Sequence, residues 1–347
     1  MARVLVVTSS PLLVEGGHLV IARSLVGALH ESGHEADLLV TPQNRFGRQG
    51  AAYLATWLTD VGLAADNRPV DHVVSLRYPS YAVRHPSHVC WLNHRMREYY
   101  DRWPEFASTL GWLALQKERV RRVAIRAVDR YLLTRNVRRV FAQSYTIHER
   151  LARHGGIGSE VLYPPPPLRD YRCDGYGEDI LAVSRLTPLK RIDLAIRAIA
   201  DPASCGARLV VAGDGDQLSD LRRLAAELRV QDRVRFAGVV SERDLVGMLA
   251  RCRAVCFPPL DEDYGLVTVE AFASAKAVVT CRDSGGPTEL VQDDVEGMVC
   301  DPTPGSLAKA IGRLAEDRAL AERLGQAGHR VAQGLSWARA VSTLLAV

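Results

Sequence analysis

The stretch DEDYGLVTVE, residues 261–270, holds two glutamates, Glu262 and Glu270, with a glycine between them. The apolar run at 254–259 predicts a buried strand that leads into a loop. Gly265 permits a tight turn, and the apolar residues after it predict a helix. Glu262 is therefore expected in the loop and Glu270 in the helix, on either side of helix-start N–H groups that can bind an anion. This arrangement suits carboxylates that grip hydroxyl groups beside a bound phosphate.

Two cations follow another expected strand. Arg185 comes directly after a short apolar run, and Lys190 lies just before the next helical pattern. Arginine binds phosphate through paired hydrogen bonds and lysine binds it as a point charge, so the pair can serve a diphosphate, although a surface pair has the same spacing. The stretch VVAGDGDQL lacks the third glycine of a dinucleotide fingerprint, because Leu218 stands there. Its Asp-Gly-Asp triplet, like the acidic triplet 261–263, is expected in a turn rather than at a metal.

The elements that must position these residues alternate between strands and helices along the whole chain. Four consecutive prolines at 164–167 interrupt the alternation and mark the expected domain boundary. We therefore predict an α/β protein of two Rossmann-like domains with doubly wound parallel sheets, at residues 1–163 and 164–335, followed by a carboxy-terminal helix at 336–347. Ligands of such sheets bind beyond the carboxyl ends of the strands, which predicts a site in a cleft between two facing domains.

The composition narrows the class of protein. With 47% hydrophobic and 24% charged residues, the chain is typical of a globular protein rather than a disordered one. No apolar run is long enough to span a bilayer, and the first residues indicate a strand rather than a signal peptide. Seven scattered cysteines suit a reducing compartment, so we expect a cytoplasmic protein; Cys252 and Cys256 lack a second pair for zinc. The net charge of +4 gives no general case for nucleic acid.

A basic segment at 119–139 contains eight arginines and a single acid. At helical spacing the arginines form one stripe and apolar residues form another. The two stripes are Arg119, Arg122, Arg126, Arg130 and Val120, Ala124, Ala127, Tyr131. One interpretation is an amphipathic helix with a solvated basic face. The other is contact with a phosphorylated acceptor or an anionic lipid surface, which would place the protein peripherally at the inner membrane face.

Over nearly its whole length the chain resembles the retaining glycosyltransferases of GT-B fold, family four, also called glycosyl transferases group 1, which use nucleoside-diphosphate sugars. The resemblance rests on several motifs in family order. They are Gly16-Gly17, LNHRMREYYD, SRLTPLKRIDLAIRA, VVAGDGDQL, VRFAG, EDYGLVTVE and SGGPTELV. It implies a GT-B fold in which the last helix crosses back to the first domain, with an acceptor site in the first domain and a donor site in the second.

The resemblance also implies roles for single residues. Glu270 would hold the ribose hydroxyls of the donor nucleotide, and Glu262 the hydroxyls of the donor sugar. Arg185 and Lys190 would bind the diphosphate, and His94 would line the sugar pocket near the reacting carbon. Glu262, His94, Arg185 and Lys190 are thus the expected catalytic residues. The remaining expected donor-binding residues are Gly16, Gly17, Gly213, Tyr264, Gly265, Leu266 and Val267.

The chemistry of the reaction agrees with these roles. Breaking a sugar–phosphate bond leaves negative charge on the departing diphosphate, which cations and helix amides stabilise, so neither a metal nor a cofactor is expected. The resemblance implies transfer of a hexose from a UDP- or GDP-linked sugar to a glycosidic, lipid-linked or natural-product hydroxyl, with retention of anomeric configuration. A glycosidase also uses a pair of carboxylates, but that function would explain neither the cations nor the glycines. Two alternative functions remain: a nucleotide-sugar epimerase on the same fold and a noncatalytic nucleotide-sugar binder. Two residues also have alternative roles: Glu270 would only complement the helix dipole, and His94 would only make hydrogen bonds within its loop.

Overall fold

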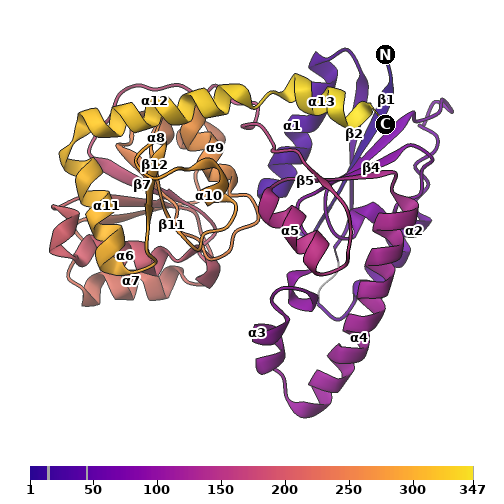
Figure 1. Ribbon diagram of the computed structural model, residues 1–347, viewed down its shortest axis with the longest axis horizontal. Coiled ribbons are helices and arrows are strands. Elements are labelled where there is room, and N and C mark those ends of the chain that lie inside the picture. Colours follow the sequence, from indigo (N-terminus) through magenta and orange to yellow (C-terminus); the bar gives the residue numbers. More distant parts are fainter. Residues whose placement is uncertain (14–15, 44–45, 347) are drawn as a thin grey trace. The chain divides into compact units, whose positions relative to one another are not determined.

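The computed structural model describes residues 1–13, 16–43 and 46–346 (Figure 1). The chain folds as two compact units. The first unit comprises Met1–Pro167 together with Ser336–Val347, and the second comprises Leu168–Leu335. No helix within the described residues is long and apolar enough to cross a membrane.

A parallel sheet organises the first unit, with the strand order β2-β1-β3-β4-β5-β6. All five residues of β4 are buried, as expected for a strand covered on both faces. The strands are β1 Arg3–Ser10, β2 Glu35–Pro42, β3 His72–Ser75, β4 His88–Leu92, β5 Arg139–Ala142 and β6 Glu160–Val161. The helices are α1 Gly17–Glu31, α2 Gln49–Leu58, α3 Trp103–Ser108, α4 Trp112–Tyr131, α5 Tyr145–Arg153 and α13 Trp337–Leu345, with short turns η1 Ser80–Ala82, η2 Arg97–Tyr99 and η3 Leu132–Asn136.

The second unit, all of which is described, contains a second parallel sheet with the order β12-β11-β10-β7-β8-β9. The strands are β7 Asp179–Val183, β8 Arg208–Ala212, β9 Val234–Gly238, β10 Ala254–Cys256, β11 Val278–Cys281 and β12 Gly297–Cys300. The helices are α6 Ile192–Ala200, α7 Leu218–Glu227, α8 Glu242–Arg251, α9 Leu266–Ala273, α10 Pro287–Leu290, α11 Pro304–Glu316 and α12 Arg318–Gly334, with short turns η4 Pro188–Lys190 and η5 Pro202–Ser204. The predicted pair of doubly wound sheets is confirmed.

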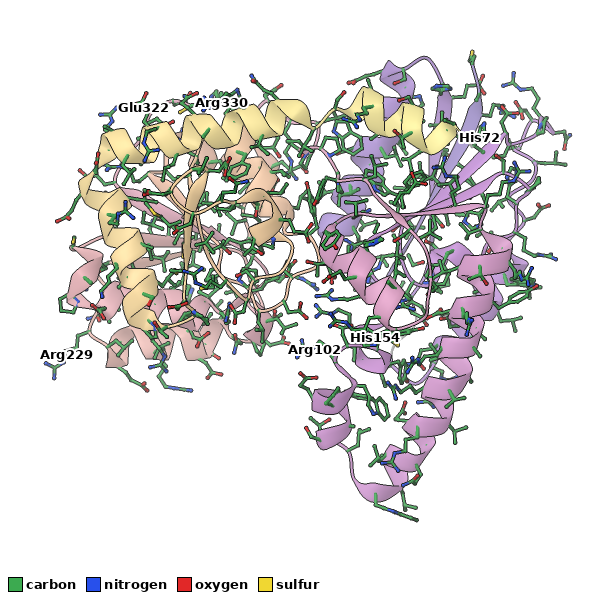
Figure 2. The ribbon with its side chains drawn as sticks, viewed as in Figure 1. His72, Arg102, His154, Arg229, Glu322 and Arg330 are labelled. Atoms are coloured by element: carbon green, nitrogen blue, oxygen red, sulfur yellow. The ribbon has the colours of Figure 1, made fainter. Side chains whose placement is uncertain are left out.

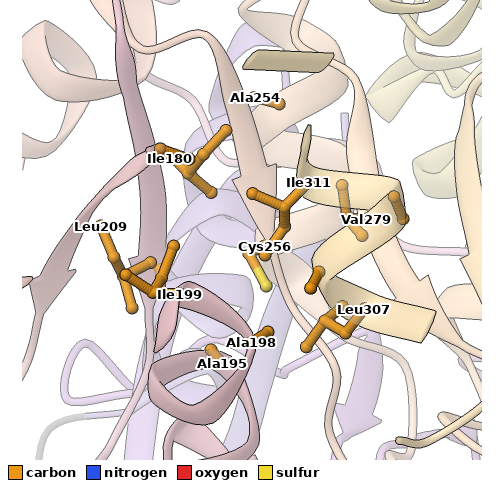
Figure 3. Close-up of a cluster of buried hydrophobic side chains, with 14 of the residues drawn as sticks. Ile180, Ala195, Ala198, Ile199, Leu209, Ala254, Cys256, Val279, Leu307 and Ile311 are labelled. Carbon is orange, nitrogen blue, oxygen red and sulfur yellow. The ribbon is translucent and has the colours of Figure 1, made fainter. Parts of the chain in front are cut away.

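The core of the second unit lies between its sheet and the helices α6 and α11 (Figure 3). Ile180, Cys256 and Val279 point from neighbouring strands toward Ile199 of α6 and Ile311 of α11, and all five are fully buried. Burying such side chains stabilises the folded state by about 1.5–3 kcal/mol each. This packing fixes the strand ends that carry the candidate site.

Helix α12 packs on α9, so the outer face of α12 is exposed to solvent and its inner face is buried. Figure 2 shows Glu322 and Arg330 on its outer surface, where both are exposed. On the inner face, Gly328 packs so closely on α9 that a Cβ at this position would lie 2.3 Å from the Phe272 ring. Close packing on α12 therefore holds α9 in place.

The last helix and the proline run both belong to the first unit. The Trp337 Nε1 donates a hydrogen bond of 2.8 Å to the carbonyl of Pro166, and its ring meets Trp91 edge to face at 6.1 Å. Helix α13 also contacts α1. Because Trp337 ties down the proline run, the units divide between Pro167 and Leu168 rather than between 163 and 164.

The basic helix α4 differs in part from the interpretation of a solvated basic face. Arg122 lies over the Trp103 ring at 4.7 Å and Arg126 over the Tyr100 ring at 5.6 Å, whereas Val120 and Tyr131 face solvent. The interpretation holds for Arg119 and Arg130, which are exposed, and fails for Arg122 and Arg126; the two buried acids of α4 turn the apolar stripe outward.

Candidate functional site

The predicted site residues of the second unit gather at one edge of its sheet. The chain builds β7, β8 and β9 in one direction and then returns to add β10 on the other side of β7. The carboxyl ends of β7 and β10 therefore lie side by side at the point where the strand order reverses, which is where ligands of such sheets bind. Arg185 and Lys190 follow β7, and Glu262 follows β10.

Lys190 and Glu262 form an ion pair across these two loops. The Lys190 Nζ donates to the Glu262 Oε2 at 2.6 Å, and the two side chains are only 16% and 22% exposed. The backbone joins the same loops, because the amide of Leu260 donates to the carbonyl of Leu189 at 2.7 Å. The structure thus brings together a cation and a carboxylate that the sequence had predicted separately.

Arg191, which the sequence analysis did not single out, fastens three loops of this edge. Its guanidinium donates to the carbonyls of Pro258 and Pro259 at 2.7 Å each, and to both carboxylate oxygens of Asp283 at 2.8 and 2.6 Å. Arg191 adopts a left-handed conformation at φ 49°, directly before α6. The sequence signal for this role of Arg191 is the pair of prolines. Because proline has no amide N–H, strand pairing stops before these two residues, and their carbonyls need hydrogen-bond donors from outside the sheet.

The backbone around Glu262 continues the pairing of β10 with β11. The amide of Glu262 donates to the carbonyl of Ser284 at 2.9 Å, and the amide of Gly286 donates to the carbonyl of Glu262 at 2.9 Å. The hydroxyl of Ser284 donates to the carbonyl of Pro259 at 2.8 Å. Glu262 therefore projects from a paired, hydrogen-bonded segment rather than from a loose loop.

Helix α9 begins at this edge with a glycine N-cap, which has no side chain to cap the first turn. Its N-cap is Gly265 at φ 80°, where a Cβ would lie 2.9 Å from the Phe257 ring and 2.8 Å from Pro287, so only glycine fits. The half-buried Leu266 and Val267 supply the first amides, which have no partner within a helix. The first turn carries no acid, so its dipole and amides suit an anion.

Glu270 lies further along α9 and is 4% exposed. Its Oε1 accepts hydrogen bonds from the guanidinium of Arg169 and, at 3.0 Å, from the hydroxyl of Tyr171. Burial raises the pKa of Glu270 above its ordinary value, and the charge of Arg169 opposes this shift. Arg169 and Tyr171 were missed by the sequence analysis, since they stand about 100 residues before the carboxylate they contact.

The other predicted residues of this unit lie around the same edge. Arg185 is exposed, and its side chain makes no ion pair or hydrogen bond with residues 168–335. Gly213 follows β8 and has φ 133°; a Cβ there would lie 1.9 Å from the carbonyl of Ser184, so the loops after β7 and β8 meet backbone to backbone. Tyr264 is 2% exposed.

Three predicted residues belong to the first unit, at the carboxyl edge of its own sheet. Gly16 is the N-cap of α1 and Gly17 its first residue, after β1. His94 follows β4, and its Nδ1 donates to the carbonyl of Arg95 at 2.7 Å. The described residues contain no group of histidine, cysteine or acidic side chains arranged to hold a metal ion.

Comparison with known proteins finds a family model that matches most of the second unit. Residues 172–331 match the family model for glycosyl transferases group 1. The chain is 36% identical over 183 residues to a D-inositol 3-phosphate glycosyltransferase of Salinispora tropica, across 49% of this chain and 38% of that protein. It is 33% identical over 209 residues to the protein of the same name from Kribbella flavida, across 55% and 48%. The matched regions span less than half of each relative's length.

Solved structures match nearly the whole chain. Sucrose-phosphate synthase from Thermosynechococcus elongatus has a TM-score of 0.75 at 18% identity, over 99% of this chain and 98% of that one. Anabaena HepE, solved in complex with UDP and glucose, has a TM-score of 0.72 at 16% identity over 99% of both chains. At these identities the likeness shows a shared fold. The chain has the GT-B fold, and its residues 172–331 match the model of the glycosyl transferases group 1 family.

Proposed function

We propose that this protein is a retaining hexosyltransferase that moves a hexose from a UDP- or GDP-linked sugar to the hydroxyl of an acceptor. The observation that carries the proposal is the Lys190–Glu262 pair, 2.6 Å apart, at the same sheet edge as the glycine N-cap of α9. A cation and helix amides suit a diphosphate, and the carboxylate suits sugar hydroxyls. The donor class is supported by HepE, which was solved with UDP and glucose, and glycosyl transfer by the D-inositol 3-phosphate glycosyltransferases.

Each charged group has a role that its surroundings support. Lys190 has three N–H donors, of which Glu262 takes one, so the same ammonium can also bind a phosphate oxygen. Arg185 is exposed at the strand end and can add two parallel hydrogen bonds. Arg169 and Tyr171 both bond Oε1 of Glu270, so we assign Oε2 to the ribose hydroxyls.

The reaction breaks the bond between the anomeric carbon and the phosphate oxygen, and the bonding electrons leave with the diphosphate. We propose that Arg185, Lys190 and the amides of Leu266 and Val267 stabilise this charge, which removes the need for a divalent cation. The acceptor oxygen attacks on the same face, and its proton passes to the departing phosphate oxygen, so no protein nucleophile takes part. The Nδ1 of His94 donates to a carbonyl, which fixes the orientation of the ring, and we assign this ring to the sugar pocket.

The test begins with donor binding, because it needs no acceptor. UDP, GDP, UDP-glucose and GDP-mannose are compared by thermal shift, and the true donor raises the unfolding temperature by mass action. That donor is then incubated with inositol phosphate and simple glycosides. Free nucleoside diphosphate that appears only with an acceptor supports transfer, whereas an isomerised donor, or no stabilisation by any nucleotide, contradicts it.

Variants at the ion pair locate the site. Glu262→Gln is expected to lower turnover about 100-fold, because the donor sugar loses its positioning carboxylate, while nucleotide affinity is kept. Asp263→Asn is the matched control, since it neutralises the neighbouring half-buried acid. Equal turnover in wild type and Glu262→Gln would show that the sugar binds elsewhere.

A further inference from the structure

Helix α4 presents apolar residues to solvent along its whole length. At 3.6 residues per turn these side chains fall on one side of the helix, here called the outward stripe. Its large members are between 57% and 76% exposed, and two exposed alanines lie among them. The outward stripe consists of Trp112, Leu113, Val120, Val123, Ala124, Ala127 and Tyr131. An apolar surface of this kind on one helix marks an interaction site.

The opposite side of α4 explains why the stripe faces outward. Asp129 is fully buried and accepts hydrogen bonds from the hydroxyls of Tyr53, Tyr81 and Tyr100, the last two at 2.5 and 2.7 Å. Glu118 is 8% exposed and accepts a bond of 2.7 Å from a further tyrosine hydroxyl. Rotating the helix to bury its apolar stripe would strip both carboxylates of these donors, which is unfavourable. The exposure is therefore built into the fold.

The charges that border the stripe are all positive. Lys117 lies on one side of it, and Arg119 and Arg130 lie on the other, all exposed. Helix α4 is described in full, and its two acids are the buried ones, so no carboxylate accompanies these cations on the outer side. Directly after α4, a cavity of about 550 Å³ is lined by residues 84–86 and 135–138, with three arginines and no acid.

We propose that the outward stripe of α4 docks on an anionic lipid surface, with its apolar side chains at the boundary of the acyl chains and its flanking cations at the lipid phosphates. A 20-residue helix is about 30 Å long and lies well in the plane of such an interface. Trp112 and Tyr131, near its two ends, are residues that favour the membrane–water boundary.

Charge selects the lipid surface over a second copy of the chain. Two copies joined through this face would set the arginines of one against those of the other, without a carboxylate to pair them. Anionic headgroups offer the complementary charge. The proposal does not rest on the proposed activity, because α4 belongs to the first unit and the candidate donor site to the second.

The test uses the whole chain and vesicles of phosphatidylcholine with or without phosphatidylglycerol. Co-sedimentation is expected with the anionic vesicles, and it should weaken as salt is raised. The double variant Val120→Glu, Val123→Glu should weaken binding at least tenfold, because it sets two charges in the apolar stripe. Val239→Glu is the matched control: Val239 is 80% exposed in the second unit, and its variant should bind as wild type does.

A second pair of variants separates charge from apolar contact. Arg119→Glu with Arg130→Glu should weaken binding to anionic vesicles by about fivefold or more for each residue, whereas lysine at both positions should preserve it. All these side chains are exposed, so each variant should fold, which circular dichroism checks. Equal binding to both kinds of vesicle would overturn the charge argument.

Fluorescence reports which face touches the lipid. Trp112 is the most exposed of the five tryptophans, so brominated lipid chains should quench its emission, and Trp112→Phe should remove most of that quenching while binding persists. Two outcomes contradict the proposal. One is vesicle binding without quenching of Trp112. The other is no vesicle binding together with a wild-type dimer that Val120→Glu, Val123→Glu dissociates in the ultracentrifuge, which would assign the face to a second copy.

Discussion

At the scale of single residues, Arg169 determines whether the buried carboxylate of Glu270 is tolerated. Their side chains are 9% and 5% exposed, so each depends on the other for its charge. Arg169→Met is expected to destabilise the fold by about 3 kcal/mol at neutral pH, because it leaves a buried carboxylate without its cation. Arg172→Met is the matched control, since Arg172 is 51% exposed and pairs at the surface with Asp174.

The pH dependence of that variant has a definite sign. The pKa of Glu270 is already raised by burial, and loss of Arg169 raises it further. Between the unfolded pKa and the raised folded pKa, the folded chain binds more protons than the unfolded chain, so the free energy of unfolding falls as pH rises through that window. Arg169→Met should therefore be closest to wild type in acid, and adding Glu270→Gln should recover stability at neutral pH. Urea unfolding across the pH range measures both; a loss that is equal at every pH contradicts the account.

The site residues predicted from the sequence share one property: each stands in a loop after an apolar run or in the first two turns of a helix. Strand ends and helix starts are visible in the chain, so Lys190, Glu262 and Gly265 could be predicted. Arg169 and Arg191 could not, because their partners lie far along the sequence and only the folded sheet brings them together. Pairing of Glu262 with Lys190 was also beyond the sequence, which showed each residue but not their contact.

At the scale of elements, the start of α9 depends on Gly265. Gly265→Ala is expected to lower stability by about 1–3 kcal/mol, since it combines a strained φ with contacts below 3.0 Å to Phe257 and Pro287. Gly33→Ala is the matched control, because Gly33 has the same φ of 80° and nothing within 4 Å of the added Cβ. The difference between the two unfolding temperatures measures the contacts alone. Equal losses would mean that α9 can shift to make room.

Elements also show where sequence patterns mislead. The alternation of apolar runs predicted both sheets, because a strand buried on two faces must be apolar whatever surrounds it. Helix α4 shows the opposite case: its apolar stripe has the spacing of a core-facing side, yet it faces solvent. Three tyrosines from elsewhere in the first unit decide its rotation, and a pattern within one helix contains no information about them.

At the scale of the whole molecule, the second unit is inserted into the first, which α13 completes. Trp337→Ala is expected to lower the unfolding temperature of the first unit, because it removes the edge contact with Trp91 and the hydrogen bond to Pro166. Trp337→Phe keeps a ring but loses the bond, which should cost about 1 kcal/mol. Calorimetry follows the transitions, and the second unit should unfold as in wild type. A loss confined to the second unit would refute this assignment of α13.

The insertion also sets an order of events during synthesis on the ribosome. The second unit can close its sheet as soon as its last strand has emerged, whereas α1 must wait for residues 336–346 before its α13 partner arrives. The first unit is thus completed only after the second, and a nascent chain stalled before residue 336 would expose the unfinished first unit to chaperones and proteases.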